Sequence, residues 1–144
     1  MSNEEIYQKL YDLINTPYKI GSLDPKEGLD CLTFIIHFYT HILGMNLNID
    51  IPRYSTDWYK DKPATYYLNA VKYCDLKKYK GQYIEPYSIL CFSIEGRPIS
   101  HMGIYFGNNQ VIHCVEDKGV TIHKLSLCRK QLSYIAVIKE SYHG

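Results

Sequence analysis

Three residues of this 144-residue chain have the types expected of a nucleophilic site: Cys31, His101 and His113. Cys31 follows Asp30 where a glycine-containing loop enters an apolar run, so we expect the thiol at the start of a helix. The positive end of a helix dipole favours a thiolate, and a neighbouring imidazolium favours it further. The thiolate is the nucleophilic form of cysteine. These residues therefore predict a cysteine hydrolase site whose thiol has a low pKa.

The stretch ISHMGIYFGNNQVIHC, residues 99–114, predicts a β-hairpin that carries both histidines. A three-residue loop at 107–109 would pair Gly103 with His113, and His101 would then lie diagonally within reach of His113 on the same sheet face. A two-residue Asn-Asn turn would instead put the histidines on opposite faces. In the first arrangement His113 could hold the His101 ring in the right tautomer. The hairpin alone also allows two unrelated polar side chains on a solvated face.

The elements that must position these residues are helices first and strands afterwards, which is typical of the α+β class. Ser2 and Glu5 have capping-box spacing before a helix that we expect to end near Asn15. After a loop at 17–30, a buried helix is expected from Cys31 to Gly44. A possible short helix at 64–74 precedes an antiparallel sheet of about five strands, at 88–94, 100–106, 110–116, 119–125 and 133–140. The length favours one domain over residues 1–144.

Composition argues against several other classes of protein. Apolar residues make up 46% of the chain and charged residues 22%, a balance typical of a folded domain. A net charge of +1 gives no electrostatic reason to expect a nucleic-acid or membrane partner. Five cysteines without a CxxC pair argue against a disulfide framework and against a zinc ribbon. The N-terminal sequence lacks a signal-peptide pattern, so we expect a cytoplasmic protein as encoded.

Three further histidines are candidates for other roles. His37 and His41 lie four residues apart, a spacing that could hold a metal ion, but no third ligand is evident. We therefore expect no metal site and no cofactor. His123 falls on a later predicted strand and could lie near the site, although we expect that it does not.

Two stretches of the chain resemble the NlpC/P60 family of cysteine peptidases. Residues 16–39, TPYKIGSLDPKEGLDCLTFIIHFY, resemble the family's loop and nucleophile helix, and residues 100–122, SHMGIYFGNNQVIHCVEDKGVTI, resemble its histidine-bearing strands. IPRYSTDWY at 51–59 is similar to a family segment between them. The resemblance spans roughly residues 10–138. It implies a papain-like α+β fold in which the nucleophile helix packs against the antiparallel sheet.

The resemblance also implies a role for each site residue. Cys31 would be the nucleophile, His101 the general base and later the acid, and His113 the residue that orients His101. Tyr18 stands at the family's tyrosine position and would line the site near the thiol. The implied catalytic set is therefore a Cys-His-His triad without a metal.

One departure from the family pattern bears directly on substrate recognition. The family's usual DCSG is DCLT here, so Leu32 stands in place of a serine. In the family, that serine and the aspartate kept here as Asp30 help to hold the free amino end of a peptidoglycan stem peptide. A leucine side chain cannot accept a hydrogen bond from an ammonium group. The expected substrate-binding residues are Tyr18, Asp30 and Leu32, with altered recognition at Leu32.

The function that the resemblance implies is cleavage of an amide bond in a bacterial cell-wall peptide, at a γ-D-glutamyl link. The expected partner is a peptide or peptidoglycan fragment. Leu32 motivates one alternative, an amidase or acyltransferase that acts on another small amide. The other alternative is a non-catalytic phage-tail or assembly module that keeps the fold. A phage-tail or delivery partner would make the protein virion-associated or delivered by another system.

Overall fold

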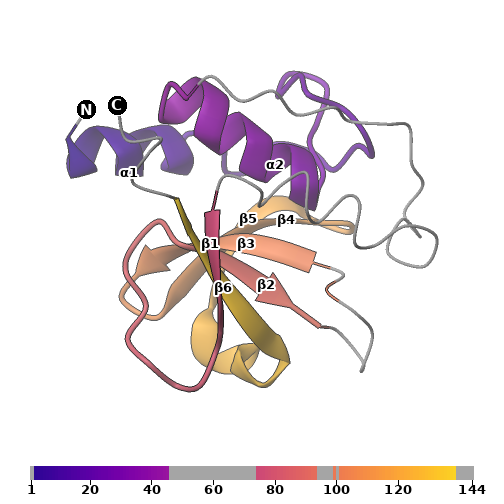
Figure 1. Ribbon diagram of the computed structural model, residues 1–144. Coiled ribbons are helices and arrows are strands. Elements are labelled where there is room, and N and C mark those ends of the chain that lie inside the picture. Colours follow the sequence, from indigo (N-terminus) through magenta and orange to yellow (C-terminus); the bar gives the residue numbers. More distant parts are fainter. Residues whose placement is uncertain (1, 46–73, 94–98, 100, 139–144) are drawn as a thin grey trace.

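The computed structural model describes residues 2–45, 74–93, 99 and 101–138. Within these ranges, the helices cover one face of a six-stranded antiparallel sheet, and two short 3-10 turns lie on the other side (Figure 1). None of the helices in this part of the chain is long and apolar enough to cross a membrane. The IPRYSTDWY segment and the possible helix at 64–74 lie outside the described residues, except that Cys74 begins a strand.

The first helix, α1 (Asn3–Tyr11), begins where the sequence predicts and ends earlier. Ser2 Oγ accepts a hydrogen bond from the Glu5 amide at 3.2 Å, as an N-cap residue does. The expected end near Asn15 is wrong by four residues. Asn15 has a positive φ of 76° and donates its amide to the Val120 carbonyl at 2.9 Å. The segment after Tyr11 therefore does not continue the helix, and its end pairs with the sheet instead.

The second helix, α2 (Cys31–His37), continues directly into the π-helical segment η1 (Phe38–Ile42). The Thr40 hydroxyl donates to the Ile36 carbonyl at 2.8 Å, a bond that competes with the regular helical pattern. Gly44 follows with a φ of +71°, a conformation that glycine adopts readily. The predicted buried helix is confirmed, although its second half winds more widely than an α-helix.

The sheet has the strand order β1-β6-β2-β3-β4-β5, and every neighbouring pair is antiparallel. Its strands are β1 (Cys74–Lys78), β2 (Ile89–Phe92), β3 (His101–Gly107), β4 (Gln110–Val115), β5 (Gly119–Lys124) and β6 (Leu132–Ile138). Strands β2 to β5 form a meander. The 3-10 turns η3 (Leu125–Leu127) and η4 (Arg129–Gln131) then lead the chain to β6, which lies between β1 and β2.

Five of the six strands are predicted from the sequence, and the edge strand β1 is not. Only Cys74 of this strand is buried, and the four residues after it are exposed. An edge strand with one buried residue has no alternating apolar pattern that could reveal it. Its pairing with β6 depends on backbone hydrogen bonds, from Cys74 opposite Ile138 to Lys78 opposite Tyr134.

Buried side chains gather on both faces of the sheet. The larger cluster includes Phe34, Met102 and Ile112 and lies between the helices and the sheet. The smaller cluster, on the opposite face, includes Phe92 and Leu125. Because α2 packs on β3 and β4, the end of the helix that carries the thiol is held against the histidine-bearing hairpin. The predicted α+β class with an antiparallel sheet is confirmed.

Candidate active site

Cys31 is the first residue of α2, and the residue before it fixes the start of the helix. Asp30 Oδ1 accepts the backbone amides of Leu32 and Thr33, each at 2.8 Å. Thr33 Oγ1 in turn accepts the Asp30 amide at 2.8 Å, which completes a capping box. These bonds place the thiol at a defined position in the first helical turn.

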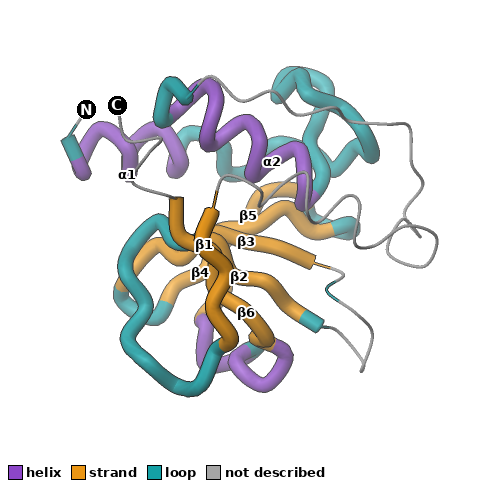
Figure 2. The backbone as a smooth tube through the Cα atoms, viewed as in Figure 1, coloured by secondary structure: helices purple, strands orange, loops and turns teal. Residues whose placement is uncertain are grey.

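The loop before Cys31 is closed at its base by backbone pairing. Leu29 donates its amide to the Pro17 carbonyl at 2.9 Å, and Lys19 donates to the Leu29 carbonyl at 3.0 Å. Gly28 sits in this close approach with a φ of +142°, and a Cβ there would lie 2.7 Å from both Lys19 Cβ and the Pro17 oxygen. The second carboxylate oxygen of Asp30 accepts the Gly21 amide at 2.7 Å. The loop therefore holds both Tyr18 and Asp30 beside the helix start. Figure 2 shows the loop between α1 and α2 in teal.

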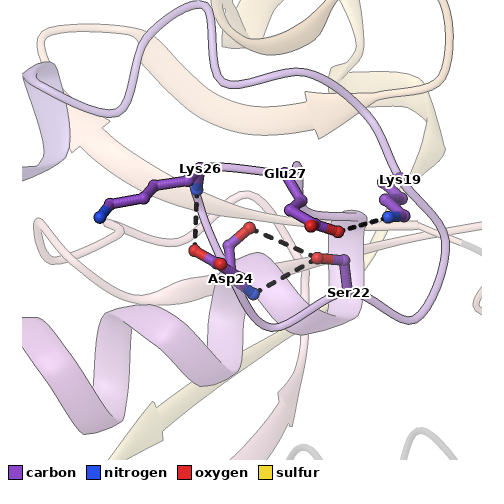
Figure 3. Close-up of polar contacts among 5 residues, drawn as sticks. All are labelled: Lys19, Ser22, Asp24, Lys26 and Glu27. Carbon is purple, nitrogen blue, oxygen red and sulfur yellow. Dashed lines mark hydrogen bonds and ion pairs between the residues drawn. The ribbon is translucent and has the colours of Figure 1, made fainter.

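Exposed polar contacts close the outer part of the same loop (Figure 3). Lys19 Nζ and Glu27 Oε2 form an ion pair at 2.5 Å. Asp24 Oδ1 accepts the Lys26 amide at 3.0 Å, and Ser22 Oγ accepts the Asp24 amide at 3.3 Å. Exposed contacts of this kind contribute little energy each, so their main effect is on the shape of the loop.

The two predicted histidines meet across β3 and β4. His101 Nε2 lies 2.8 Å from His113 Nδ1, and the ring centroids are 5.0 Å apart at an interplanar angle of 61°. Ile104 pairs with Ile112, and this is the register that the sequence predicts for Gly103 opposite His113. A Cβ at Gly103 would lie 2.9 Å from Val111 Cγ1 and 3.0 Å from His113 Cβ, so a glycine at this position avoids a clash with both side chains.

The prediction of the hairpin turn is wrong in one detail. Gly107 pairs with Gln110, so the turn has two residues, Asn108 and Asn109, both with positive φ. A two-residue turn alone would have separated the histidines onto opposite faces. The register shifts between Tyr105 and Gly107, which makes Phe106 the extra residue of a β-bulge. The bulge restores the register that brings His101 and His113 together.

A third histidine, which the sequence reasoning set aside, extends this pair. His123 Nδ1 lies 2.9 Å from His113 Nε2, with the rings nearly perpendicular at 87°. His123 pairs with Val111 across β4 and β5. Val111 lies two residues before His113, so the side chains of His113 and His123 lie on the same sheet face. The diagonal rule that relates His101 to His113 could have found His123 as well. The expectation that His123 lies away from the site is wrong.

Both of the predicted histidines are held neutral by their surroundings. Burial lowers the pKa of His101 to about 4, and repulsion from His123 adds to the shift. Burial lowers the pKa of His113 to about 3, with repulsion from His101 and His123 in addition. At neutral pH each ring therefore carries one proton, and each can accept another at its free nitrogen.

The thiol does not have the lowered pKa that the sequence predicts. Cys31 is only 5% exposed, and burial raises its pKa well above the usual value. The Asp30 carboxylate raises the pKa further, and a hydrogen bond from the Met102 backbone lowers it by less. Met102 directly follows His101, so the thiol lies against the start of β3. No hydrogen bond joins the Cys31 thiol to the His101 ring among the described residues.

The structure places the three predicted substrate-binding residues around the thiol. Burial raises the pKa of the Tyr18 hydroxyl, and the nearby Cys31 and Asp30 groups raise it further. Asp30 and Leu32 are buried, with 1% and 3% exposed. Tyr18 is thus the one of the three that is partly open to solvent.

Comparison with known proteins identifies the family to which the chain belongs. The model of the NlpC/P60 family matches residues 15–138, which is most of the chain. The chain belongs to the NlpC/P60 family.

Two relatives support the assignment. The chain is 29% identical over 124 residues to the gamma-DL-glutamyl hydrolase of Bacillus subtilis (strain 168). It is 26% identical over 125 residues to a probable endopeptidase NlpC homolog of Haemophilus influenzae.

These relatives are longer proteins. The matches cover 84% and 87% of this chain, but 25% of the Bacillus subtilis protein and 56% of the Haemophilus influenzae protein. The chain therefore spans about a quarter and about half of the lengths of the two relatives.

Solved structures agree with the family assignment. The NlpC/p60 domain of the peptidoglycan hydrolase SagA superposes with a TM-score of 0.63 at 20% identity, and the match covers 96% of this chain and 100% of that domain. NlpC1 of Trichomonas vaginalis gives a TM-score of 0.63 at 20% identity, with 92% of this chain and 42% of that chain covered. The expected papain-like fold of an NlpC/P60 domain is confirmed.

Other cysteines and histidines of this NlpC/P60 domain have structural contacts. Cys114 Sγ donates to the Leu29 carbonyl at 2.9 Å, and Cys74 Sγ lies 3.4 Å from the Tyr39 hydroxyl. His37 and His41 stack with ring centroids 4.8 Å apart. In the part of the chain that the structure describes, no group of three or more side chains is arranged to hold a metal ion.

Proposed function

We propose that this NlpC/P60 domain is a cysteine peptidase or amidase that cleaves the γ-D-glutamyl link of a bacterial cell-wall peptide. The observation that carries the proposal is the 2.8 Å contact of His101 Nε2 with His113 Nδ1, together with the position of the Cys31 thiol against the backbone of Met102, the residue after His101. Family membership supports a thiol hydrolase, and one relative is named for the hydrolysis of a gamma-glutamyl link.

The proposed reaction starts from a neutral thiol and a neutral imidazole. His101 Nδ1 takes the proton of Cys31 Sγ as the sulfur bonds to the carbonyl carbon of the substrate. His113 Nδ1 holds the His101 ring by its contact with His101 Nε2, in the way that an orienting group of a triad does. The Cys31 backbone amide can stabilise the oxyanion. His101 then gives its proton to the leaving amine, and water hydrolyses the thioester.

The test is a mass-spectrometric assay on muropeptides with the wild type, Cys31→Ala and His101→Ala. The wild type should release the residue that follows D-glutamate. Each substitution should lower the rate by at least about a thousandfold, because nucleophile and base act as a unit. The control is Cys128→Ala, a partly exposed cysteine outside the site, which should cleave like the wild type. Unchanged cleavage by a folded Cys31→Ala protein would exclude the proposal.

A second candidate is an amidase whose substrate has no free amino group. Its support is the burial of Leu32 and Asp30, together with the three backbone amides that donate to the Asp30 carboxylate. An ammonium group would have to reach this buried carboxylate, and Leu32 provides no acceptor beside it. N-acylated amides are therefore the substrates to compare with free stem peptides.

Two substitutions at one position separate the candidates. Leu32→Ser and Leu32→Ala remove similar side-chain volume, but only serine supplies an acceptor. The wild type should cleave a stem peptide with a free amine weakly, and Leu32→Ser should be faster than Leu32→Ala by about ten- to a hundredfold. That factor corresponds to one charge-assisted hydrogen bond of about 1.5 to 3 kcal/mol. Equal, fast cleavage by the wild type and both variants would contradict the argument.

The non-catalytic alternative and the phage-tail or delivery partner remain separate hypotheses, and the names of the relatives do not support them. Failure of the folded wild type to cleave any muropeptide or N-acylated amide would favour the non-catalytic module.

A further inference from the structure

Three histidines form an unbroken chain across one face of the sheet. β3, β4 and β5 contribute one ring each: His101, His113 and His123. His101 Nε2 faces His113 Nδ1 at 2.8 Å, and His113 Nε2 faces His123 Nδ1 at 2.9 Å. His113 is 7% exposed and has both ring nitrogens engaged, while the two outer rings are partly exposed. The inner ring is therefore the link between the two outer ones.

The proton of the middle ring couples the two contacts. A neutral imidazole has one N–H donor and one acceptor nitrogen, so two facing nitrogens share one proton. If His113 carries its proton on Nε2, it donates to His123 and accepts from His101 Nε2–H. His101 Nδ1 then has a free lone pair. If the direction is reversed, His101 Nδ1 carries a proton and cannot take one from a thiol.

We propose that His123 is a positioning residue of the catalytic site: its Nδ1 accepts the His113 Nε2–H and thereby keeps His101 Nδ1 unprotonated toward Cys31. The inference rests on the proposed function, because only a general base at His101 requires this direction of donation. The thiol proton moves to His101 Nδ1 and later to the leaving nitrogen. The protons of His113 and His123 stay on their own rings throughout.

The third ring differs from a simple packing residue in what can replace it. Asparagine can place an acceptor oxygen near the position of Nδ1, whereas leucine has a similar size and no polar atom. With His123→Leu, the His113 Nε2–H loses its acceptor, and the opposite tautomer of His113 is no longer disfavoured. A purely structural role would not distinguish a polar from an apolar residue in this way.

The experiment compares the wild type, His123→Asn and His123→Leu by imidazole ¹⁵N NMR and by steady-state kinetics at pH 7. In the wild type, His101 should show a protonated Nε2 and an unprotonated Nδ1. His123→Leu should give mixed tautomers at His101 and His113, with kcat lowered about tenfold and KM unchanged. His123→Asn should keep the wild-type tautomers and a kcat within about threefold of the wild type. His41→Leu, at an exposed histidine outside the site, is the control and should change neither readout.

The proposal is overturned if His123→Leu keeps the wild-type tautomers of His101 and His113 and the wild-type kcat. It is also overturned if the asparagine and leucine variants lose kcat equally. The NMR measurement needs no substrate, so it tests His123 even if the wild type cleaves nothing. In that case the proposed function fails alone, and the tautomers of His101 and His113 still decide whether His123 sets the direction of donation.

Discussion

At the Cys31 thiol, three physical effects compete for control of the pKa. A helix N-terminus favours a nearby negative charge by about 0.3 to 1 kcal/mol, which is less than one pKa unit. Full burial can shift a pKa by several units toward the neutral form. The Asp30 carboxylate acts in the same direction as burial and also accepts two amides of the first turn. Burial and Asp30 therefore prevail, and the resting thiol is neutral.

The first prediction follows from this balance. Iodoacetamide should label Cys31 at least about tenfold more slowly in the native protein than in urea, between pH 6 and 8. Asp30→Asn keeps the Oδ1 acceptor and removes the negative charge, so the pH midpoint of native labelling should fall. Asp24→Asn, at an exposed aspartate of the same loop, should leave that midpoint unchanged. If Cys31 is the fastest cysteine to label at pH 6, the sequence-based expectation of a low pKa is correct instead.

At the scale of elements, the N-terminal loop and β5 are joined at a single close approach. The Val120 amide donates to the Thr16 carbonyl at 2.8 Å, and Asn15 donates back to the Val120 carbonyl. Gly119 makes this possible, because its φ is +75° and a Cβ there would lie 2.0 Å from the Thr16 oxygen. The junction leads directly into the segment of Pro17 and Tyr18, so it connects the strand of His123 with the loop beside the thiol.

The second prediction concerns Gly119→Ala, with Gly81→Ala as its matched control. Gly81 has a φ of +84° and nothing within 4 Å of the position of a Cβ, so alanine there meets only backbone strain. Such strain costs of order 1–3 kcal/mol. Gly119→Ala should cost about 1 to 3 kcal/mol more than Gly81→Ala, because overlap with backbone adds to the strain. Urea unfolding measures both, and equal losses would show that the junction opens without cost.

At the scale of the whole molecule, burying neutral histidines makes stability depend on pH. An unfolded histidine titrates near about pH 6.5, whereas the pKa is about 4 for His101 and about 3 for His113 in the folded state. Between these values the unfolded chain binds more protons than the folded chain. The contribution of the two rings is therefore complete above about pH 6.5 and is lost as the pH falls.

The third prediction is that the free energy of unfolding decreases as the pH is lowered from 7 to 5. Each buried neutral histidine contributes up to about 1.4 kcal/mol per pH unit below its unfolded pKa. His113→Asn removes one such group, so its unfolding free energy should depend less steeply on pH, whatever its effect at pH 7. Urea titrations at pH 7, 6 and 5 provide the comparison. Parallel curves for the wild type and the variant would show that His113 titrates normally in the folded state.

Features that depend on near neighbours along the chain can be predicted from the residues alone. Capping at Ser2, apolar helix positions after Cys31 and alternating residues in β3 and β4 are local patterns, so the elements and the meeting of His101 with His113 could be predicted. The twelve-residue interval between these histidines and the DC pair also sufficed for the family resemblance.

Features that depend on contacts between distant segments appear only in the folded protein. The bulge at Phe106 compensates for a two-residue turn, and no residue type in the hairpin predicts this bulge. β1 became a strand because β6 supplies its hydrogen-bonding partners. The thiol pKa rises rather than falls because burial and a carboxylate outweigh the helix dipole. His123 joins the site because β5 aligns beside β4, since strand pairing places its ring against His113.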